Sequence, residues 1–294
     1  MNKHEWLNLA EYPFKQHSFT IDGMKMNYID EGRGAPVVMV HGTPSWSFLY
    51  RDLVKELMDN YRCIVPDHLG FGLSEKKAGA DYRPETQARR LEALIDSLGL
   101  DQITLVVHDF GGPIGLNYAI KHPEKISRLI ISNTWMWSLA NEPSVAWASR
   151  FFGSALGKWI YTKTNFSAGY LFKQGFNDKK KLDSDIFDHY KSPFQTPEDR
   201  YSTWIYAREL LKSKDWYQQL WEERSKIAHI PTLLVWGMQD KFFSPKVLEQ
   251  WETVFSDAQI VRLKDGGHFI QEENGADYVG AVEDFLQKYD VVVG

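Results

Sequence analysis

Short apolar runs rich in β-branched residues recur along the chain and predict eight strands. They cover residues 17–21, 25–30, 36–40, 61–65, 102–107, 126–132, 231–236 and 259–263. The first two runs are separated by Asp22-Gly23, a pair typical of a hairpin turn. The chain therefore begins with an antiparallel pair of strands.

Helical periodicity fills most of the intervals between the later strands. It covers residues 46–58, 84–98, a segment from Gly111 onward, 245–254 and 280–289. Strands that alternate with helices favour a mostly parallel sheet covered on both faces. The pattern thus predicts an α/β fold after the antiparallel start.

The strand pattern disappears between Trp135 and about residue 225. This region is rich in aromatic residues and has helical periods, as in residues 203–211. We expect a core domain made of residues 1–134 and 226–294, with a helical cap of residues 135–225 inserted after the sixth strand. Ligands of open α/β sheets bind at the carboxyl ends of the strands, so a cap there would enclose them.

Composition and net charge indicate which kinds of binding partner and which cellular location to expect. The 294 residues are 43% hydrophobic and carry a formal net charge of −5, which gives no sign of binding to nucleic acid or to an anionic membrane. Cys63 is the single cysteine, so no internal disulfide forms. No signal-peptide core and no apolar run of about 20 residues is present, and we expect a cytoplasmic protein, monomeric or weakly dimeric.

The candidate nucleophile is Asp109. It follows the apolar run 103–107 and precedes a helix that begins near Gly111 and Gly112, so it lies on a sharp strand-to-helix turn, the nucleophile elbow. A carboxylate at this position is suited to attack a saturated carbon and form an ester that water later cleaves. A surface turn aspartate would not need the two small glycines beside it.

Two further residues complete a candidate triad. His268 follows the last strand and is the expected base for the water that cleaves the ester. Asp240 follows the strand 231–236 and is the expected carboxylate that orients the imidazole. The segment after the strand 126–132 offers no acid before Glu142, which favours Asp240.

Backbone donors complete the predicted site. His41-Gly42-Thr43-Pro44 follows the strand 36–40, and the N–H groups of Thr43 and Phe110 are candidates for an anion hole. Such a hole would hold one oxygen of Asp109 and later stabilise the tetrahedral intermediate.

These segments together make the chain similar to the α/β-hydrolase superfamily, and more closely to the haloalkane dehalogenases. The similarity spans nearly the whole chain and includes the elbow and Gly267-His268-Phe269. HGTPSWSFLYR (41–51) and YKSPF (190–194) are the more dehalogenase-like motifs, whereas PDHLGFGLS (66–74) is shared by many hydrolases. The resemblance implies an eight-stranded, mostly parallel α/β-hydrolase sheet with a helical cap.

The resemblance also implies a reaction. Asp109 would displace halide from a small apolar substrate, and water activated by His268 with Asp240 would release the alcohol, without a metal or an organic cofactor. The family holds the departing halide with N–H groups of a Trp after the nucleophile and of an Asn or a second Trp. This chain has Phe110 and Thr43 at the first two positions, and Trp159 in the cap is the candidate replacement.

Other reactions remain open. An epoxide hydrolase would use the same triad with cap tyrosines as acids, for which Tyr161, Tyr170, Tyr201 and Tyr206 are available. A luciferase-like oxygenase and a ligand-binding member of the fold are further alternatives. A luciferase-like protein usually keeps Trp after the aspartate, and a binding protein has no need of a triad.

Overall fold

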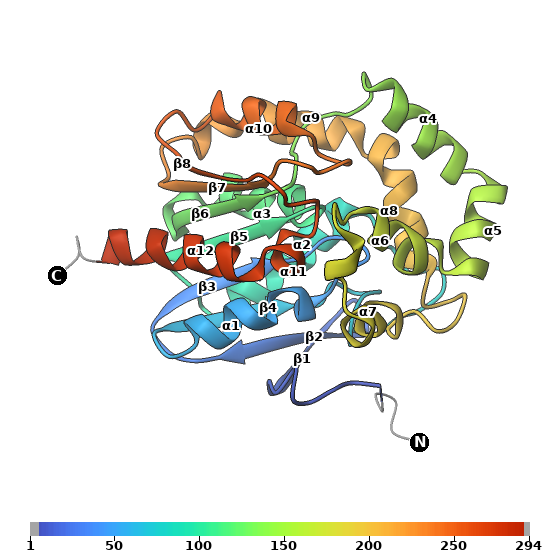
Figure 1. Cartoon of the computed structure of the whole chain (residues 1–294), viewed down its shortest axis with the longest axis horizontal. Coiled ribbons are helices and arrows are strands. Elements are labelled where there is room, and N and C mark those ends of the chain that lie inside the picture. The colour runs from blue at the N-terminus through green and yellow to red at the C-terminus, as the bar shows by residue number, and fades with distance from the viewer. Residues whose placement is uncertain (1–5, 291–294) are drawn as a thin grey trace.

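The strands of the computed structural model, which describes residues 6–290, form one eight-stranded sheet (Figure 1). They are β1 (Gln16–Ile21), β2 (Met24–Glu31), β3 (Ala35–Val40), β4 (Tyr61–Pro66), β5 (Ile103–His108), β6 (Ile126–Ser132), β7 (Thr232–Gly237) and β8 (Gln259–Leu263). Their order is β1-β2-β4-β3-β5-β6-β7-β8. β2 is antiparallel to both neighbours, and the other neighbouring pairs are parallel. The predicted sheet is confirmed.

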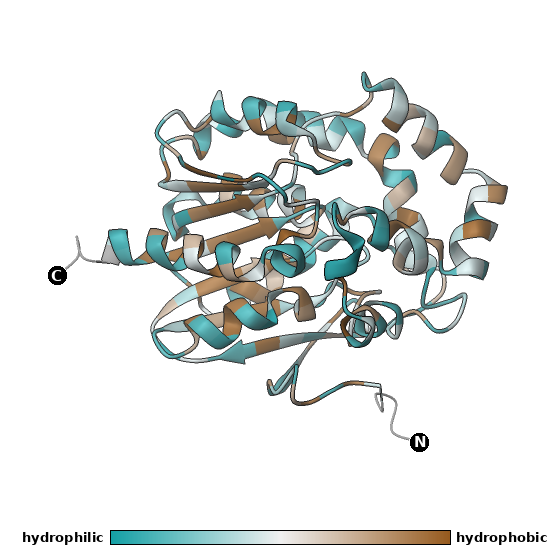
Figure 2. Cartoon of the chain, viewed as in Figure 1, coloured by the Kyte–Doolittle hydropathy of each residue, from teal (hydrophilic) through white to brown (hydrophobic). Residues whose placement is uncertain are grey.

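Helices cover both faces of this sheet because the central strands are apolar on both sides. Val38 and Leu105 belong to the core shared with α2 (Pro84–Ser97) and α3 (Gly111–Lys121), whereas Val37 and Val106 belong to the core shared with α1 (Arg51–Leu57) and α12 (Gly275–Asp290). Successive residues of a strand point to opposite faces, so this alternation buries every residue of β5. Figure 2 shows the predominantly hydrophobic colour of the central strands.

Two helix predictions differ from the structure at their ends. Residues 46–58 form a 3-10 turn, η1 (Ser47–Tyr50), followed by α1, and the final helix begins at Gly275 instead of residue 280. Tyr278, Val282 and Phe285 give that helix a continuous buried face. Gly280 lies where an added Cβ would meet nothing, so the helix passes through it. The remaining core elements are η2 (Pro123–Lys125), α10 (Pro245–Glu252) and α11 (Ile270–Glu273).

The region between β6 and β7 is helical and lies beyond the carboxyl ends of the strands (Figure 1). Its elements are α4 (Pro143–Phe152), α5 (Ala155–Thr164), the π-helical η3 (Phe166–Leu171), α6 (Phe172–Gln174), η4 (Lys179–Lys181), α7 (Ser184–Lys191), α8 (Tyr201–Lys212), α9 (Lys214–Glu222) and η5 (Arg224–Lys226). These helices fall almost entirely within residues 135–225, the range predicted for the cap, and η5 crosses its end. Within the described part of the chain, no helix is long and apolar enough to cross a membrane.

Candidate active site

Asp109 occupies the tight turn between β5 and α3. Its φ of 52° is in the left-handed region, which a non-glycine residue rarely adopts. The turn is held by its neighbours: the Asp109 N–H donates to the Asn133 carbonyl at 3.2 Å, and the Thr134 hydroxyl donates to the Asp109 carbonyl at 2.5 Å. A Cβ on Gly112 would lie 1.8 Å from the Thr134 hydroxyl oxygen, so this turn requires glycine there.

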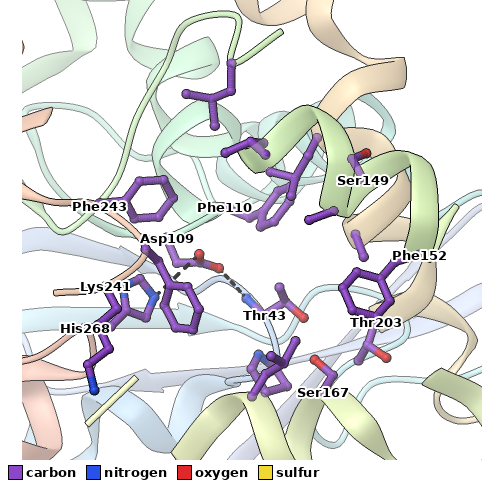
Figure 3. Close-up of a pocket in the computed structure, with 18 of the residues that line it drawn as sticks. Thr43, Asp109, Phe110, Ser149, Phe152, Ser167, Thr203, Lys241, Phe243 and His268 are labelled. Atoms are coloured by element: carbon purple, nitrogen blue, oxygen red, sulfur yellow. Dashed lines mark hydrogen bonds and ion pairs between the residues drawn. The ribbon is translucent and has the colours of Figure 1, made fainter. Parts of the chain in front are cut away.

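The carboxylate of Asp109 is positioned by the loop after β3. The backbone N–H of Thr43 donates to Asp109 Oδ1 at 2.7 Å (Figure 3). A Cβ on Gly42 would lie 2.0 Å from the same oxygen, which explains why glycine precedes Thr43. The Thr43-Pro44 peptide bond is cis. One oxygen of the carboxylate is therefore anchored, and the other faces the histidine.

His268 lies between two carboxylates. Its Nδ1 is 2.9 Å from Asp240 Oδ2 and its Nε2 is 3.6 Å from Asp109 Oδ2. Burial has the largest single effect on the His268 pKa and lowers it, but Asp240 and Asp109 together outweigh burial and raise the pKa to about 9. The imidazole is thus held as a cation while both carboxylates are charged.

Asp240 is in turn fixed by donors from two segments. The side-chain amide of Asn133 donates to Asp240 Oδ2 at 2.7 Å, and the Phe242 N–H donates to Oδ1 at 2.7 Å. Asp240 is only 4% exposed, so these bonds replace the water that a buried carboxylate loses. The arrangement leaves the imidazole of His268 with a defined orientation.

A cavity of about 330 Å³ opens above Asp109 and His268 (Figure 3). Apolar side chains of the core and of α4, η3 and α8 form most of its wall, including Phe110, Val145, Phe152, Leu210 and Phe243. Polar side chains on the wall, other than Asp109 and His268, are Thr43, Ser144, Ser149, Tyr161, Ser167, Thr203 and Lys241. The site therefore suits a small, largely apolar molecule with its reacting carbon at Asp109.

The structure brings five of the six predicted site residues together. Asp109, His268, Thr43 and Phe110 line the cavity, and Asp240 bonds to His268 behind it. The sixth, Trp159, is 55% exposed on α5 and is not part of the cavity wall, because its position on the helix points away from the core. It is not placed to hold a halide beside Asp109.

The four tyrosines considered for epoxide opening are dispersed. Tyr161 lines the cavity, and burial raises the pKa of its phenol. Tyr170 is 53% exposed, and the Tyr206 ring packs on Phe110 with its hydroxyl buried and unpaired among the described residues. Tyr201 is partly buried and packs against Tyr82 and Trp204. Only Tyr161 of the four contributes to the cavity wall.

Sequence patterns did not single out three residues that fix the site. Asn133 holds Asp240, as described above. His108 Nε2 donates to the backbone carbonyl of His268 at 2.9 Å, and burial, the main cause, helps to lower the pKa of His108 to about 4. Glu273 accepts N–H bonds from Gly267 at 2.7 Å and Asp178 at 2.6 Å, which ties the histidine loop to the cap. Each of the three has a partner remote in sequence, so no local motif marks them.

Comparison with known proteins identifies the class. A family model for the alpha/beta hydrolase fold matches residues 35–275. The chain therefore belongs to the α/β-hydrolase family. Within it, the chain is similar to haloalkane dehalogenases and to oxetanone decarboxylases, as its curated relatives show.

The first such relative is a cis-3-alkyl-4-alkyloxetan-2-one decarboxylase of Shewanella oneidensis, which is 38% identical over 95% of this chain and 91% of the relative. Haloalkane dehalogenase 2 of Mycobacterium tuberculosis is 33% identical over 89% of this chain and 91% of the relative. Among solved structures, the haloalkane dehalogenase DatA of Agrobacterium tumefaciens has a TM-score of 0.85 at 23% identity, over 96% of this chain and 99% of that one. The last likeness concerns the fold alone.

Proposed function

We propose that this protein hydrolyses small haloalkanes to an alcohol and halide through a covalent ester on Asp109. The observation that carries the proposal is the position of the Asp109 carboxylate, which Thr43 anchors on one oxygen and His268 faces on the other, in an apolar cavity. A carboxylate with few water neighbours is a good nucleophile toward saturated carbon.

The first step forms the ester. An oxygen of Asp109 attacks the carbon that bears the halogen, and the carbon–halogen bond breaks with its electron pair leaving on the halide. The halide then needs donors, because an unpaired anion in an apolar cavity is costly. The Thr43 hydroxyl is a candidate, since its oxygen is buried in the cavity wall with no partner among the described residues. The Lys241 side chain is a second candidate on the same wall.

The second step cleaves the ester. Once Asp109 is esterified its charge is lost, so the pKa of His268 falls and the imidazole can accept a proton from water. The resulting hydroxide attacks the ester carbonyl carbon of Asp109, and the Thr43 N–H stabilises the oxyanion. The ester C–O bond then breaks, the proton of the added hydroxyl group passes to the departing alkoxide to give the alcohol, and the Asp109 carboxylate is restored.

Decarboxylation of a β-lactone is the second candidate function, favoured by the 38% identical relative and by the phenylalanine at position 110. Asp109 would attack the saturated ring carbon and open the ring to a free carboxylate. Loss of CO₂ would then form the carbon–carbon double bond as the ester C–O bond breaks, which returns the electron pair to Asp109. This route holds no halide and consumes no water.

The two reactions are separated with purified wild-type protein and a His268→Gln variant. Both are incubated with 1-bromobutane, 1,2-dibromoethane, styrene oxide and a cis-3,4-dialkyl oxetan-2-one, with Asp109→Ala as the inactive control. We expect continuous bromide release from the wild type. For His268→Gln we expect one equivalent of bromide and an alkyl ester on the peptide that contains Asp109.

Alternative outcomes assign other functions. Alkene and CO₂ from the oxetanone, without bromide from either bromoalkane, would move the assignment to the decarboxylase. A hydroxyalkyl ester from styrene oxide alone would indicate epoxide hydrolysis. Folded protein that forms no adduct and no product with any of the four would refute the covalent mechanism for these substrates.

A further inference from the structure

The outer part of the cap has a charge opposite to that of the whole protein. Residues 143–177 contain one arginine and three lysines and neither aspartate nor glutamate, whereas the chain carries a net charge of −5. The four cations are exposed: Arg150, Lys158, Lys163 and Lys173. Charge is therefore strongly segregated along the chain.

The same segment exposes large apolar side chains. Trp147 is 65% exposed, Leu156 56%, Trp159 55% and Tyr170 53%. The other large exposed apolar side chains among the described residues are Leu9 and Phe242. We call these four apolar side chains and the four cations the cap face. Large exposed apolar groups that cluster in this way mark interaction surfaces.

Helical spacing places five of the eight members of the cap face together on two helices. Trp147 and Arg150 are three residues apart on α4, and Leu156, Trp159 and Lys163 follow one another at three and four residues on α5. Both helices pack against α8, and α5 also packs against η3, which carries Tyr170. The opposite sides of α4 and α5 face away from the protein at its outer edge (Figure 1).

Tryptophan and leucine beside lysine and arginine, with no acid among them, match the interface of an anionic bilayer. Indole rings and apolar side chains insert at the level of the headgroups, and the cations pair with lipid phosphates. A symmetric contact with a second copy would instead bring two sets of like charges together. The chemistry therefore selects a lipid surface over self-association.

We propose that the cap face docks this protein onto the surface of an anionic lipid bilayer. The inner sides of the same helices line the cavity through Val145, Phe152 and Tyr161, so docking places the cavity wall beside the membrane. Under the function proposed above, apolar substrates concentrated in the bilayer would then lie close to the site. The docking itself is independent of that function.

The proposal departs from the expectation drawn from net charge, which indicated no anionic membrane partner. Net charge is a sum over the whole chain, so acidic residues elsewhere outnumber the cations of the cap face and make the total negative. Salt screens the interaction between exposed charges that lie farther apart than the Debye length, which is about 8 Å at physiological ionic strength. A bilayer that touches the cap therefore responds mainly to the local cations.

Flotation with lipid vesicles tests the docking. Full-length protein is mixed with vesicles of phosphatidylglycerol or of phosphatidylcholine at low and high salt. We expect flotation with phosphatidylglycerol at low salt, at least tenfold more than with phosphatidylcholine, and loss of the excess at high salt. The variants Trp147→Ser/Trp159→Ser and Arg150→Glu/Lys163→Glu should lose flotation while circular dichroism and turnover of dissolved substrate stay unchanged.

Matched controls change similar residues outside the cap face. Leu9→Ser removes an exposed apolar side chain, and Lys246→Glu/Lys264→Glu reverses two exposed cations near β8. Both controls should float like the wild type. No flotation of the wild type, or equal loss in the controls, would overturn the proposal. A dimer in solution that the cap variants dissolve would instead assign the face to self-association.

Discussion

Asn133 holds Asp240 against His268. Its side-chain amide donates to Asp240 Oδ2 at 2.7 Å, the oxygen that also lies 2.9 Å from His268 Nδ1. The amide oxygen of Asn133 accepts the N–H of Gly237 at 3.0 Å, and its backbone carbonyl accepts the N–H of Asp109. One buried residue therefore connects the turn of the nucleophile to the loop of the acid.

Replacement of Asn133 should weaken both stability and turnover. Asn133→Ala removes one of the donors to Asp240 and leaves the Gly237 N–H without its Asn133 acceptor, which should cost about 1–3 kcal/mol of unfolding free energy. We expect kcat to fall by roughly tenfold to a hundredfold, an effect of the size that positioning partners have in metal sites. Chemical denaturation and bromide release measure the two effects.

Asn133→Gly is the matched control, because Asn133 has a φ of 36° that glycine adopts without strain. It should recover part of the stability and none of the turnover. Full recovery of kcat in the glycine variant would show that the side-chain amide has no part in positioning Asp240.

The charge state of His268 should control stability at alkaline pH. Its pKa is raised to about 9 in the folded protein, against about 6.5 in an unfolded chain. A raised folded pKa stabilises the protein fully below pH 6.5, and this contribution is lost as pH rises through about 9. Unfolding free energies measured between these values should decline.

Asp240→Asn separates this effect from general alkaline unfolding. Removal of one carboxylate lowers the folded pKa of His268 and leaves its unfolded pKa of about 6.5 unchanged, so the decline should be smaller and should end at lower pH. Imidazole NMR signals report the titration of His268 directly. An unchanged titration in Asp240→Asn would contradict the assignment of the carboxylate as the main cause of the raised pKa.

Phe110→Trp should distinguish halide release from the lactone reaction. The change adds an N–H donor beside the nucleophile, and a hydrogen bond to an anion contributes about 1.5–3 kcal/mol, or roughly tenfold or more in rate. Phe110 packs against Trp135 and Tyr206, so the larger ring should cost about 1–3 kcal/mol of stability.

Bromide release from 1-bromobutane by Phe110→Trp and by Phe110→Leu gives the comparison. The leucine variant adds no donor and should show no gain. If turnover of an oxetanone rises in Phe110→Trp while bromide release stays the same, the added donor does not serve a halide.

Glu273 should couple the cap to the catalytic histidine. Its carboxylate, in a residue only 5% exposed, accepts N–H bonds from Gly267 of the histidine loop and from Asn177 and Asp178 of the cap. Glu273→Gln turns an amide donor toward these N–H groups, so we expect a loss of about 1–3 kcal/mol in stability and a lower kcat.

Asp284→Asn, an exposed change on α12, is the control for loss of one negative charge. Thermal unfolding and single-turnover kinetics of both variants give the readout. Wild-type stability and kcat in Glu273→Gln would show that the packing of Phe269 on Phe172, with ring centroids 4.2 Å apart, holds this contact without the carboxylate.

The sequence by itself determined the strands of the sheet and the chain positions of the candidate catalytic residues. Strand periodicity and the glycines after Asp109 are local patterns that can be recognised in the sequence. Thr43, Asp240 and His268 each lie in the loop that follows the end of a parallel strand, β3, β7 or β8. Because those ends meet at one edge, Thr43, Asp240 and His268 were predicted to lie near Asp109 without any knowledge of distance.

The tertiary structure decided what surrounds these residues. The contacts of Asn133, His108 and Glu273 join segments that lie far apart in the chain, and no periodicity encodes which side chains meet across them. The side of α5 that carries Trp159 was settled by packing on α8, which turned that indole outward. Local sequence fixes which elements form, whereas the choice of buried face and partner depends on how those elements pack together.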